Sequence, residues 1–112
     1  MTSQNILLLY SPFPDAPSAT LAARALLKSR LIACANILPA SSALYWWEGK
    51  VAQESETILL AKTDSAHEAQ ARAELTGLHP YDTPAILSFP ATANAAYFEW
   101  LTTNLTPIQV GD

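Results

Sequence analysis

Charge is scarce in this chain, and no part of it is strongly basic. Asp, Glu, Lys and Arg together make up 14% of the residues, where about 25% is typical. The net charge is −4, and the sequence contains no run of Lys or Arg. This balance argues against nucleic acid and against an anionic membrane surface as partners.

Long apolar runs are also missing. The first run, Ile6–Tyr10, is five residues long, far below the ~20 that a membrane-spanning helix needs. The first cation of the chain is Arg24, so no basic segment precedes this run, as it would in a signal peptide. The sequence therefore predicts a protein without a membrane segment.

Cysteine and glycine are rare enough to exclude several kinds of site. A single Cys34 cannot form an intrachain disulfide or a four-cysteine zinc site, and it fits a reducing, cytoplasmic compartment. Three scattered glycines provide no glycine-rich loop for phosphate. The two histidines, His67 and His79, lack the i, i+4 spacing of a helical metal motif.

What is present suits one small domain that buries more surface than a monomer can. The 112 residues fit a single domain over 1–112, and half of them are hydrophobic. Three Trp, four Tyr and three Phe are enough for a real core. Because so few charges cover the remaining surface, we expect an oligomer.

Alternating apolar and breaker segments predict the order of elements. Apolar or aromatic runs predict strands over 6–10, 31–38, 44–47, 51–61 and 85–89, the two from 42 to 62 forming a long hairpin. Glu48 and Gly49 form its turn. Helical spacing predicts three helices, one after Asp15 or Ser18, one over 65–77 and one from Asn94 to Pro107.

Local signals refine these helices. The first should bury the face that carries Leu21, Ala22, Ala25, Leu26 and Ser29. The second should open with a capping box, Ser65 to Glu68, and end at Gly77. In the third, the residues that share a face are Tyr97, Trp100, Leu101 and Leu105. After it, residues 108–110 could add to a sheet edge.

The resulting order, βαββαβ followed by a helix, predicts an α+β, ferredoxin-like split βαβ fold. In this fold the second and third strands along the chain form an extended hairpin within an antiparallel sheet, and both crossover helices cover one face of the sheet. The other face needs a cover. Either the C-terminal helix or a neighbouring chain can provide it.

Several segments, in this order and spacing, resemble the CutA divalent-cation-tolerance family. They are Ala33–Pro39, Tyr45–Lys50, Glu54, Lys62–Thr63, His79–Pro84, Tyr97 and Trp100. The resemblance spans about residues 5 to 105 and implies a fold related to PII signalling proteins. It also implies a homotrimer in which extended hairpins join neighbouring sheets, and a role in tolerance of copper and other divalent metals.

Two positions depart from the family pattern. Tyr10 stands where the family commonly has a cysteine, and Ala85 stands where it has a glutamate. Both changes remove potential ligands, so we expect metal binding to be weak.

Three residues are candidate metal ligands: His79, Cys34 and Asp82. His79 precedes Pro80, which restricts its backbone to extended conformations, and its alternative role is to tie a loop to a strand end. Cys34 lies within an apolar strand, where packing in the core competes with binding of Cu(I). His67 falls near a helix start and is predicted to be a solvated surface residue.

A second group of residues is a candidate cleft between subunits: Trp47, Glu54, Lys62, Tyr81 and Trp100. Glu54 and Glu56 are two apart on a strand, so they share a face and could hold a divalent cation loosely. The alternative is a solvated hairpin or an ion pair with Lys50 or Lys62. Trp46 and Trp47 point to opposite faces, one expected in the core and the other against a partner chain.

The prediction from sequence is therefore a non-catalytic homotrimer that binds divalent cations weakly, copper foremost, without an organic cofactor. One alternative is a PII-like sensor that binds an anionic small molecule at clefts between subunits. Another is an enzyme of unassigned substrate at those clefts.

Overall fold

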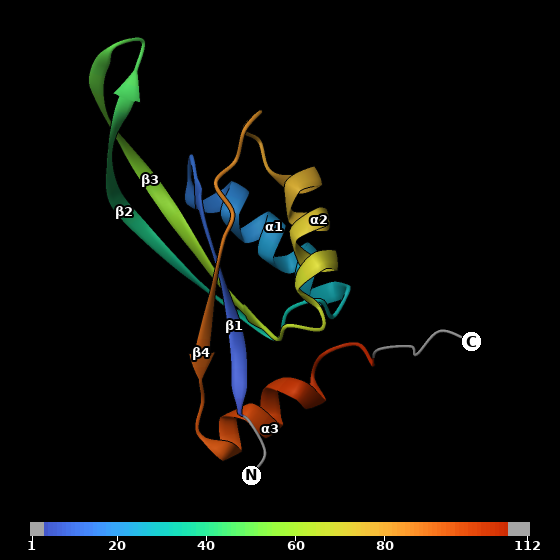
Figure 1. Ribbon diagram of the computed structural model, residues 1–112. Helices are drawn as coiled ribbons and strands as arrows, with labels where there is room; N and C mark the ends of the chain where they lie inside the picture. Colours follow the sequence, from blue (N-terminus) through green and yellow to red (C-terminus); the bar gives the residue numbers. More distant parts are fainter. Residues whose placement is uncertain (1–3, 108–112) are drawn as a thin grey trace.

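The computed structural model describes residues 4–107 and has the predicted architecture (Figure 1). One antiparallel sheet has the strand order β2-β3-β1-β4. Its elements, in chain order, are β1 (Asn5–Phe13), α1 (Ala16–Lys28), β2 (Cys34–Trp47), β3 (Lys50–Thr63), α2 (Glu68–Leu78), β4 (Leu87–Thr92) and α3 (Ala95–Thr103). The ferredoxin-like α+β prediction is confirmed.

The hairpin of β2 and β3 is the longest feature of the molecule and projects beyond the rest of the sheet (Figure 1). Each strand has 14 residues. Trp47 pairs with Lys50, which leaves Glu48 and Gly49 as a two-residue turn with φ of 50° and 79°. Positive φ at both positions matches the right-handed twist of the strands, so the predicted turn is correct.

β2 differs from the prediction of two separate segments. It begins at Cys34 instead of Leu31 and continues through Pro39 to Trp47. The register against β3 shifts between Leu38 and Ser41, where Ala40 has a φ of 63°. Since β2 is an edge strand, it can absorb both a proline and an irregularity without losing a partner on its other side.

Prolines also failed to end β1 and β4 where the sequence predicted. β1 continues through Pro12 to Phe13, and β4 runs over Leu87–Thr92, past Pro90. Pairing of β1 with β4 stops at Tyr10, so Pro12 has a partner strand only on the β3 side. Pro90 lies in β4, the other edge of the sheet. In both places one side of the proline has no partner strand, and a residue without an N–H is tolerated in such positions.

α1 begins as predicted, but its buried face is rotated. The Asp15 carboxylate accepts a hydrogen bond from the Ser18 backbone N–H at 2.8 Å, which caps the helix. Leu21 was expected in the core and is 72% exposed. The buried stripe is instead Ala19, Ala22, Ala23 and Leu26, and the small side chains of its three alanines let the helix lie close to the sheet.

α2 starts three residues later than predicted and ends later. No capping box forms: the Asp64 carboxylate accepts from the His67 N–H at 3.0 Å in a preceding turn, and the helix begins at Glu68. Gly77 lies inside the helix, which ends at Leu78. α3 does follow Asn94, as predicted, but it ends at Thr103, before Pro107. The proposed strand over 108–110 lies outside the described residues.

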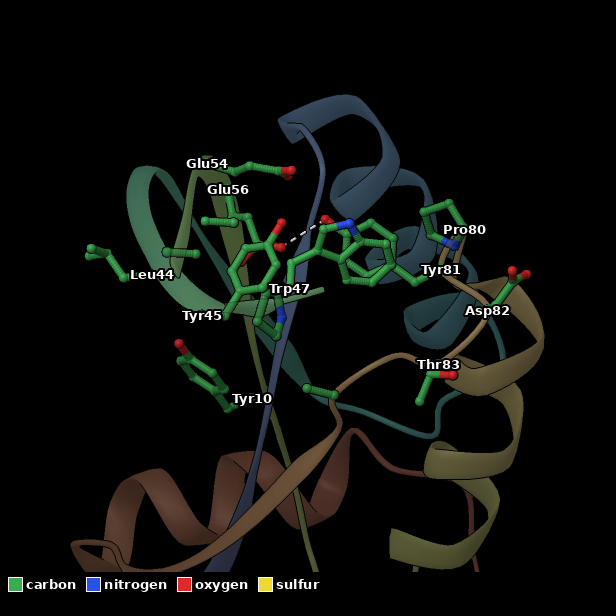
Figure 2. Close-up of a pocket in the computed structure, with 14 residues that line it drawn as sticks. Tyr10, Leu44, Tyr45, Trp47, Glu54, Glu56, Pro80, Tyr81, Asp82 and Thr83 are labelled. Atoms are coloured by element: carbon green, nitrogen blue, oxygen red, sulfur yellow. Dashed lines mark hydrogen bonds between the residues drawn. The ribbon is translucent and has the colours of Figure 1, made fainter. Parts of the chain in front are cut away.

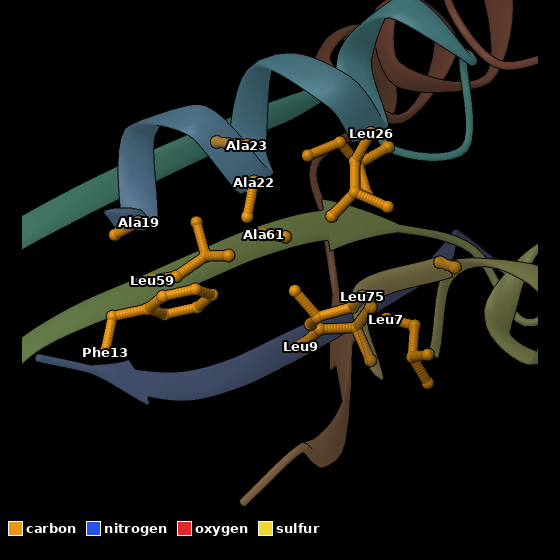
Figure 3. Packing of buried hydrophobic residues seen from close by; sticks show 12 residues of the cluster. Leu7, Leu9, Phe13, Ala19, Ala22, Ala23, Leu26, Leu59, Ala61 and Leu75 are labelled. Carbon is orange, nitrogen blue, oxygen red and sulfur yellow. The ribbon is translucent and has the colours of Figure 1, made fainter. Parts of the chain in front are cut away.

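The two faces of the sheet have separate apolar clusters. α1 and α2 cover one face, where Leu9, Phe13, Leu26, Leu59 and Leu75 are fully buried (Figure 3). α3 covers part of the other face through Leu101, which packs with Ile6, with Ala33 and with Leu105 from the segment after the helix. The rest of that face, including the hairpin, is open. Within residues 4–107, no helix is long and apolar enough to cross a bilayer.

Candidate functional site

An open groove of about 1200 Å³ lies between the outer half of the hairpin and the loop that follows α2 (Figure 2). Residues of β1, both hairpin strands and the α2–β4 connection line it: Tyr10, Pro12, Ala43, Leu44, Tyr45, Trp47, Ala52, Glu54, Glu56, Pro80, Tyr81, Asp82, Thr83 and Ala85. Both positions that depart from the family pattern, Tyr10 and Ala85, are in this lining.

The hairpin ladder places two carboxylates side by side along the groove. Glu54 and Glu56 are two residues apart on β3, and Ala43 and Ser41 lie opposite them on β2. Alternation along the strand points both side chains to the same face. The side chains directly opposite them on β2 are small and uncharged, so neither carboxylate has a counter-charge directly across the ladder.

Tyr81 connects the α2–β4 loop to the hairpin. Its hydroxyl donates a hydrogen bond to Glu56 Oε2 at 2.7 Å (Figure 2). Burial raises the pKa of the Tyr81 phenol well above its usual range, and the bond to Glu56 and the charges of Glu56 and Glu54 add to this. At neutral pH Tyr81 is thus a hydrogen-bond donor and not a base.

The groove has a negative potential. Glu54, Glu56 and Asp82 contribute three carboxylates, and none of its lining residues is Lys, Arg or His. The same field acts on Tyr45, whose pKa is raised by its interaction with the Glu54 carboxylate and, to a lesser degree, by Glu56. A groove of this kind attracts cations and repels anions.

His79 is a neighbour of Tyr81 but, unlike the residues of the open groove, it is buried. Only 8% of it is exposed, and its ring stacks on Phe13 with centroids 4.0 Å apart. Nε2 donates to the Pro12 carbonyl at 2.8 Å, and Nδ1 accepts from the Tyr81 N–H at 3.2 Å. A neutral imidazole satisfies both bonds, so His79 ties the loop to the end of β1 and sets the position of Tyr81.

This environment predicts a loss of stability in mild acid. Burial lowers the pKa of the His79 imidazole, and the opposing effects of the Pro12 carbonyl and Glu56 are smaller. The unfolded chain, with a value near 6.5, then takes up the proton first. Stability is fully present above about pH 6.5 and falls as the pH drops below it.

The measurement is urea unfolding at about pH 7 and about pH 5 for the wild type and His79→Gln. We expect the wild type to lose more stability on acidification than the variant, which cannot take up this proton. Equal losses would mean that the buried ring does not titrate differently in the two states.

The remaining predicted site residues form a second cluster, on the sheet face next to α3. Cys34 Sγ is 3.3 Å from Tyr97 Oη, and Lys62 Nζ is 5.8 Å from the centroid of the Tyr97 ring. Trp100 packs against Tyr97 with centroids 5.6 Å apart. Burial, and next the bond to Cys34, raise the pKa of Tyr97 to about 12.

The structure therefore divides the predicted residues. Trp47, Glu54, Tyr81 and Asp82 line one groove of a single chain. Cys34 and Lys62 instead lie against Tyr97 of α3, which packs with Trp100 of the same helix. Hairpin and loop residues thus meet within one chain, and a cleft shared between subunits stays a prediction. Among residues 4–107, no three His, Cys, Asp or Glu side chains gather around one point in the single chain.

Two expectations about large side chains were wrong. Neither Trp46 nor Trp47 enters the core of its own chain, since 75% and 63% of them are exposed. His67, predicted on the surface, is 3% exposed. Sequence reasoning also missed Tyr10 and Tyr45 in the groove, although their parity with Glu54 across the ladder could have indicated that they share its face.

Comparison with known proteins gives the family. The family model described as CutA1 divalent ion tolerance protein matches residues 7–104, which is most of the chain. The chain belongs to the CutA1 family. A CutA1 relative from Pectobacterium atrosepticum, named divalent-cation tolerance protein CutA, is 41% identical over 93 residues, 82% of this chain and 84% of its own. One from Pyrococcus horikoshii with the same name is 40% identical over 97 residues, 86% of this chain and 94% of its own.

Solved CutA1 structures have the same fold. The crystal structure of CutA1 from Oryza sativa has a TM-score of 0.88 at 29% identity and covers 95% of this chain and 98% of its own. That of CutA1 from Pyrococcus horikoshii has a TM-score of 0.86 at 36% identity, with coverage of 90% and 99%. The resemblance inferred from the motifs is therefore correct.

Proposed function

We propose that this protein binds divalent cations weakly and without turnover, copper foremost, at the carboxylate-lined groove. One observation carries the proposal: three carboxylates and the Tyr45 and Tyr81 hydroxyls line the groove, and no basic side chain is among the lining residues. Oxygen donors of this kind bind hard divalent cations. The names of its relatives, which are called divalent-cation tolerance proteins, also support the proposal that the ligand is a divalent cation.

The geometry also supports weak binding. Glu54 and Asp82 are exposed and Glu56 is half-buried, so a bound cation would keep part of its water shell. The negative potential disfavours the alternative of an anionic ligand at this groove. For the alternative of an enzyme, the phenols of Tyr45 and Tyr81 stay protonated near neutral pH and so cannot accept a proton, because both pKa values are raised.

The preference for copper rests on the general order of divalent affinities, in which Cu²⁺ exceeds the other first-row ions. Of the three predicted metal ligands, Asp82 lies in the groove lining, so its carboxylate can contribute to cation binding there. The ligand roles of His79 and Cys34 stay predictions: His79 would have to give up a hydrogen bond, to Pro12 or to Tyr81, and Cys34 lies near α3 beside Tyr97.

The proposal includes a homotrimer in a reducing, cytoplasmic compartment. Four large apolar side chains near the hairpin tip are 59–75% exposed in the single chain, and a neighbouring subunit would cover them: Leu44, Trp46, Trp47 and Val51. The lone Cys34 supports the compartment. A relative from Archaeoglobus fulgidus, 31% identical with a TM-score of 0.84 and with 88% of this chain and 97% of its own covered, is described as periplasmic.

Titration calorimetry with copper(II) chloride tests the groove. We expect Glu54→Gln and Glu56→Gln each to weaken binding about five- to tenfold, because each removes one solvated charge contact. Glu48→Gln is the matched control, since it removes a glutamate from the same hairpin but outside the lining, and it should change binding less than twofold.

Equal affinity of the wild type and both groove variants would contradict the proposal. The predicted ligand role of His79 has its own test: His79→Gln should weaken binding, and the wild type should bind less as the pH falls below about 6.5. If Cys34→Ser alone abolishes Cu(I) binding, the thiol is the ligand.

A further inference from the structure

His67 is buried between two hydrogen-bond acceptors that belong to distant parts of the chain. Its Nδ1 lies 2.6 Å from Asp64 Oδ1, at the end of β3, and its Nε2 lies 2.5 Å from the backbone carbonyl of Thr106, beyond α3. Only 3% of the residue is exposed. Water is therefore not available to complete the hydrogen bonding of the ring.

Neither contact atom can donate a proton to the ring. A carbonyl oxygen only accepts, and carboxyl groups are ordinarily ionised above about pH 4. A neutral imidazole has one N–H, so one of the two contacts would set a lone pair against a lone pair. The imidazolium form, with an N–H on each nitrogen, satisfies both acceptors at once.

The Thr106 contact fastens a short segment to the body of the domain. The Thr106 N–H donates to the Arg30 carbonyl at 2.9 Å, and its hydroxyl donates to the Ser29 carbonyl at 2.9 Å. The Arg30 guanidinium donates to the Asn104 carbonyl at 3.3 Å. Residues 104–106, which we name the strap, thus join α3 to the segment after α1 and, through His67, to the start of α2.

The other contacts of the strap do not change with protonation near neutral pH. The Thr106 N–H and the Thr106 hydroxyl donate to backbone carbonyls, which do not titrate. The third contact comes from a guanidinium, a group that stays charged throughout this range. Within residues 4–107, the charged side chains that form a hydrogen bond with His67 or with the strap are Asp64, from the β3–α2 connection, and Arg30, from the segment after α1. Among these kinds of side chain, imidazole is the one that ordinarily changes its charge between pH 5 and 8.

We propose that His67 is a proton-operated clasp for the strap. As an imidazolium it bridges Asp64 and Thr106. When it loses a proton, the remaining N–H stays with the charged acceptor Asp64, because charge-assisted hydrogen bonds are the stronger ones. The Nε2 lone pair then faces the Thr106 carbonyl, and the strap separates from the start of α2.

Amide hydrogen exchange at Thr106, corrected for the intrinsic rate, tests the clasp. In the wild type we expect protection to be about tenfold lower at about pH 8 than at about pH 5.5, the effect of one buried hydrogen bond. In His67→Gln, which has no titrating ring, protection should be the same at both pH values. His79→Gln is the matched control and should keep the pH dependence of the wild type.

Equal protection at both pH values in the wild type, or an unchanged pH dependence in His67→Gln, would overturn the proposal. The wild type alone provides a second measurement if that variant does not fold. Ring-nitrogen NMR at about pH 5.5 should show two N–H groups on His67. A neutral tautomer under these conditions would contradict the clasp.

Discussion

Replacing two apolar side chains of the hairpin should break the assembly into single subunits. The proposed trimer has a mass three times 12.1 kDa, about 36 kDa. We expect Leu44→Thr with Trp46→Thr to give a folded 12.1 kDa species by light scattering at micromolar concentration. Burial of each such side chain contributes about 1.5–3 kcal/mol, and the change occurs in every subunit.

The design relies on where these residues lie. Leu44 and Trp46 are 65% and 75% exposed in the single chain, so their loss leaves the core intact, and Thr keeps the preference for a strand. Leu21→Thr is the matched control, since Leu21 is 72% exposed on α1, away from the hairpin. A hairpin variant that kept the mass of the wild type would show that the hairpin is not the interface.

Phe13→Ala should have the largest effect on the stability of the fold. Phe13 is fully buried in the cluster beneath α1, and its removal leaves a cavity that costs about 3–5 kcal/mol. The stability of a small domain is about 5–15 kcal/mol, so this loss is a large share. Urea unfolding measures it, with Leu27→Ala, 39% exposed on α1, as the control at about 1 kcal/mol or less.

The same variant should also affect the groove, because the Phe13 ring supports His79 and His79 holds the Tyr81 N–H. Without this support we expect the raised pKa of Tyr81 to move back toward its ordinary value, measured by spectroscopic titration of the phenol. A Phe13→Ala protein as stable as Leu27→Ala would contradict the burial of Phe13 in this cluster.

The order of the elements and their topology could be predicted because local signals marked them. Alternating breakers bounded the apolar runs, and Glu48 and Gly49 indicated a tight turn between two aromatic and aliphatic strands. Strand ends at Pro12 and Pro90 could not be predicted in this way. Whether a proline ends a strand depends on which side of it lacks a partner, and only the assembled sheet determines this.

The candidate site could be predicted only where local sequence signals determine its geometry. Glu54 and Glu56 follow from strand alternation, whereas the meeting of Tyr81 with Glu56 depends on the path of the loop after α2. Lys62 lies on β3 with the glutamates, but too far along the strand to reach them. His67 was misjudged because the Thr106 carbonyl, which its Nε2 contacts, lies 39 residues further along the chain.

The position of β1 in the sheet also has a consequence for synthesis on the ribosome. β1 is made first, yet both of its partners come late: Phe13 pairs with Thr57, and Asn5 lies opposite Thr92, 87 residues away. The hairpin can form as soon as β3 emerges, but the sheet is complete only when β4 has been made. Until then the apolar β1 stays unpaired on one edge, so the nascent chain is exposed to aggregation, and refolding should be slow for a domain of this size.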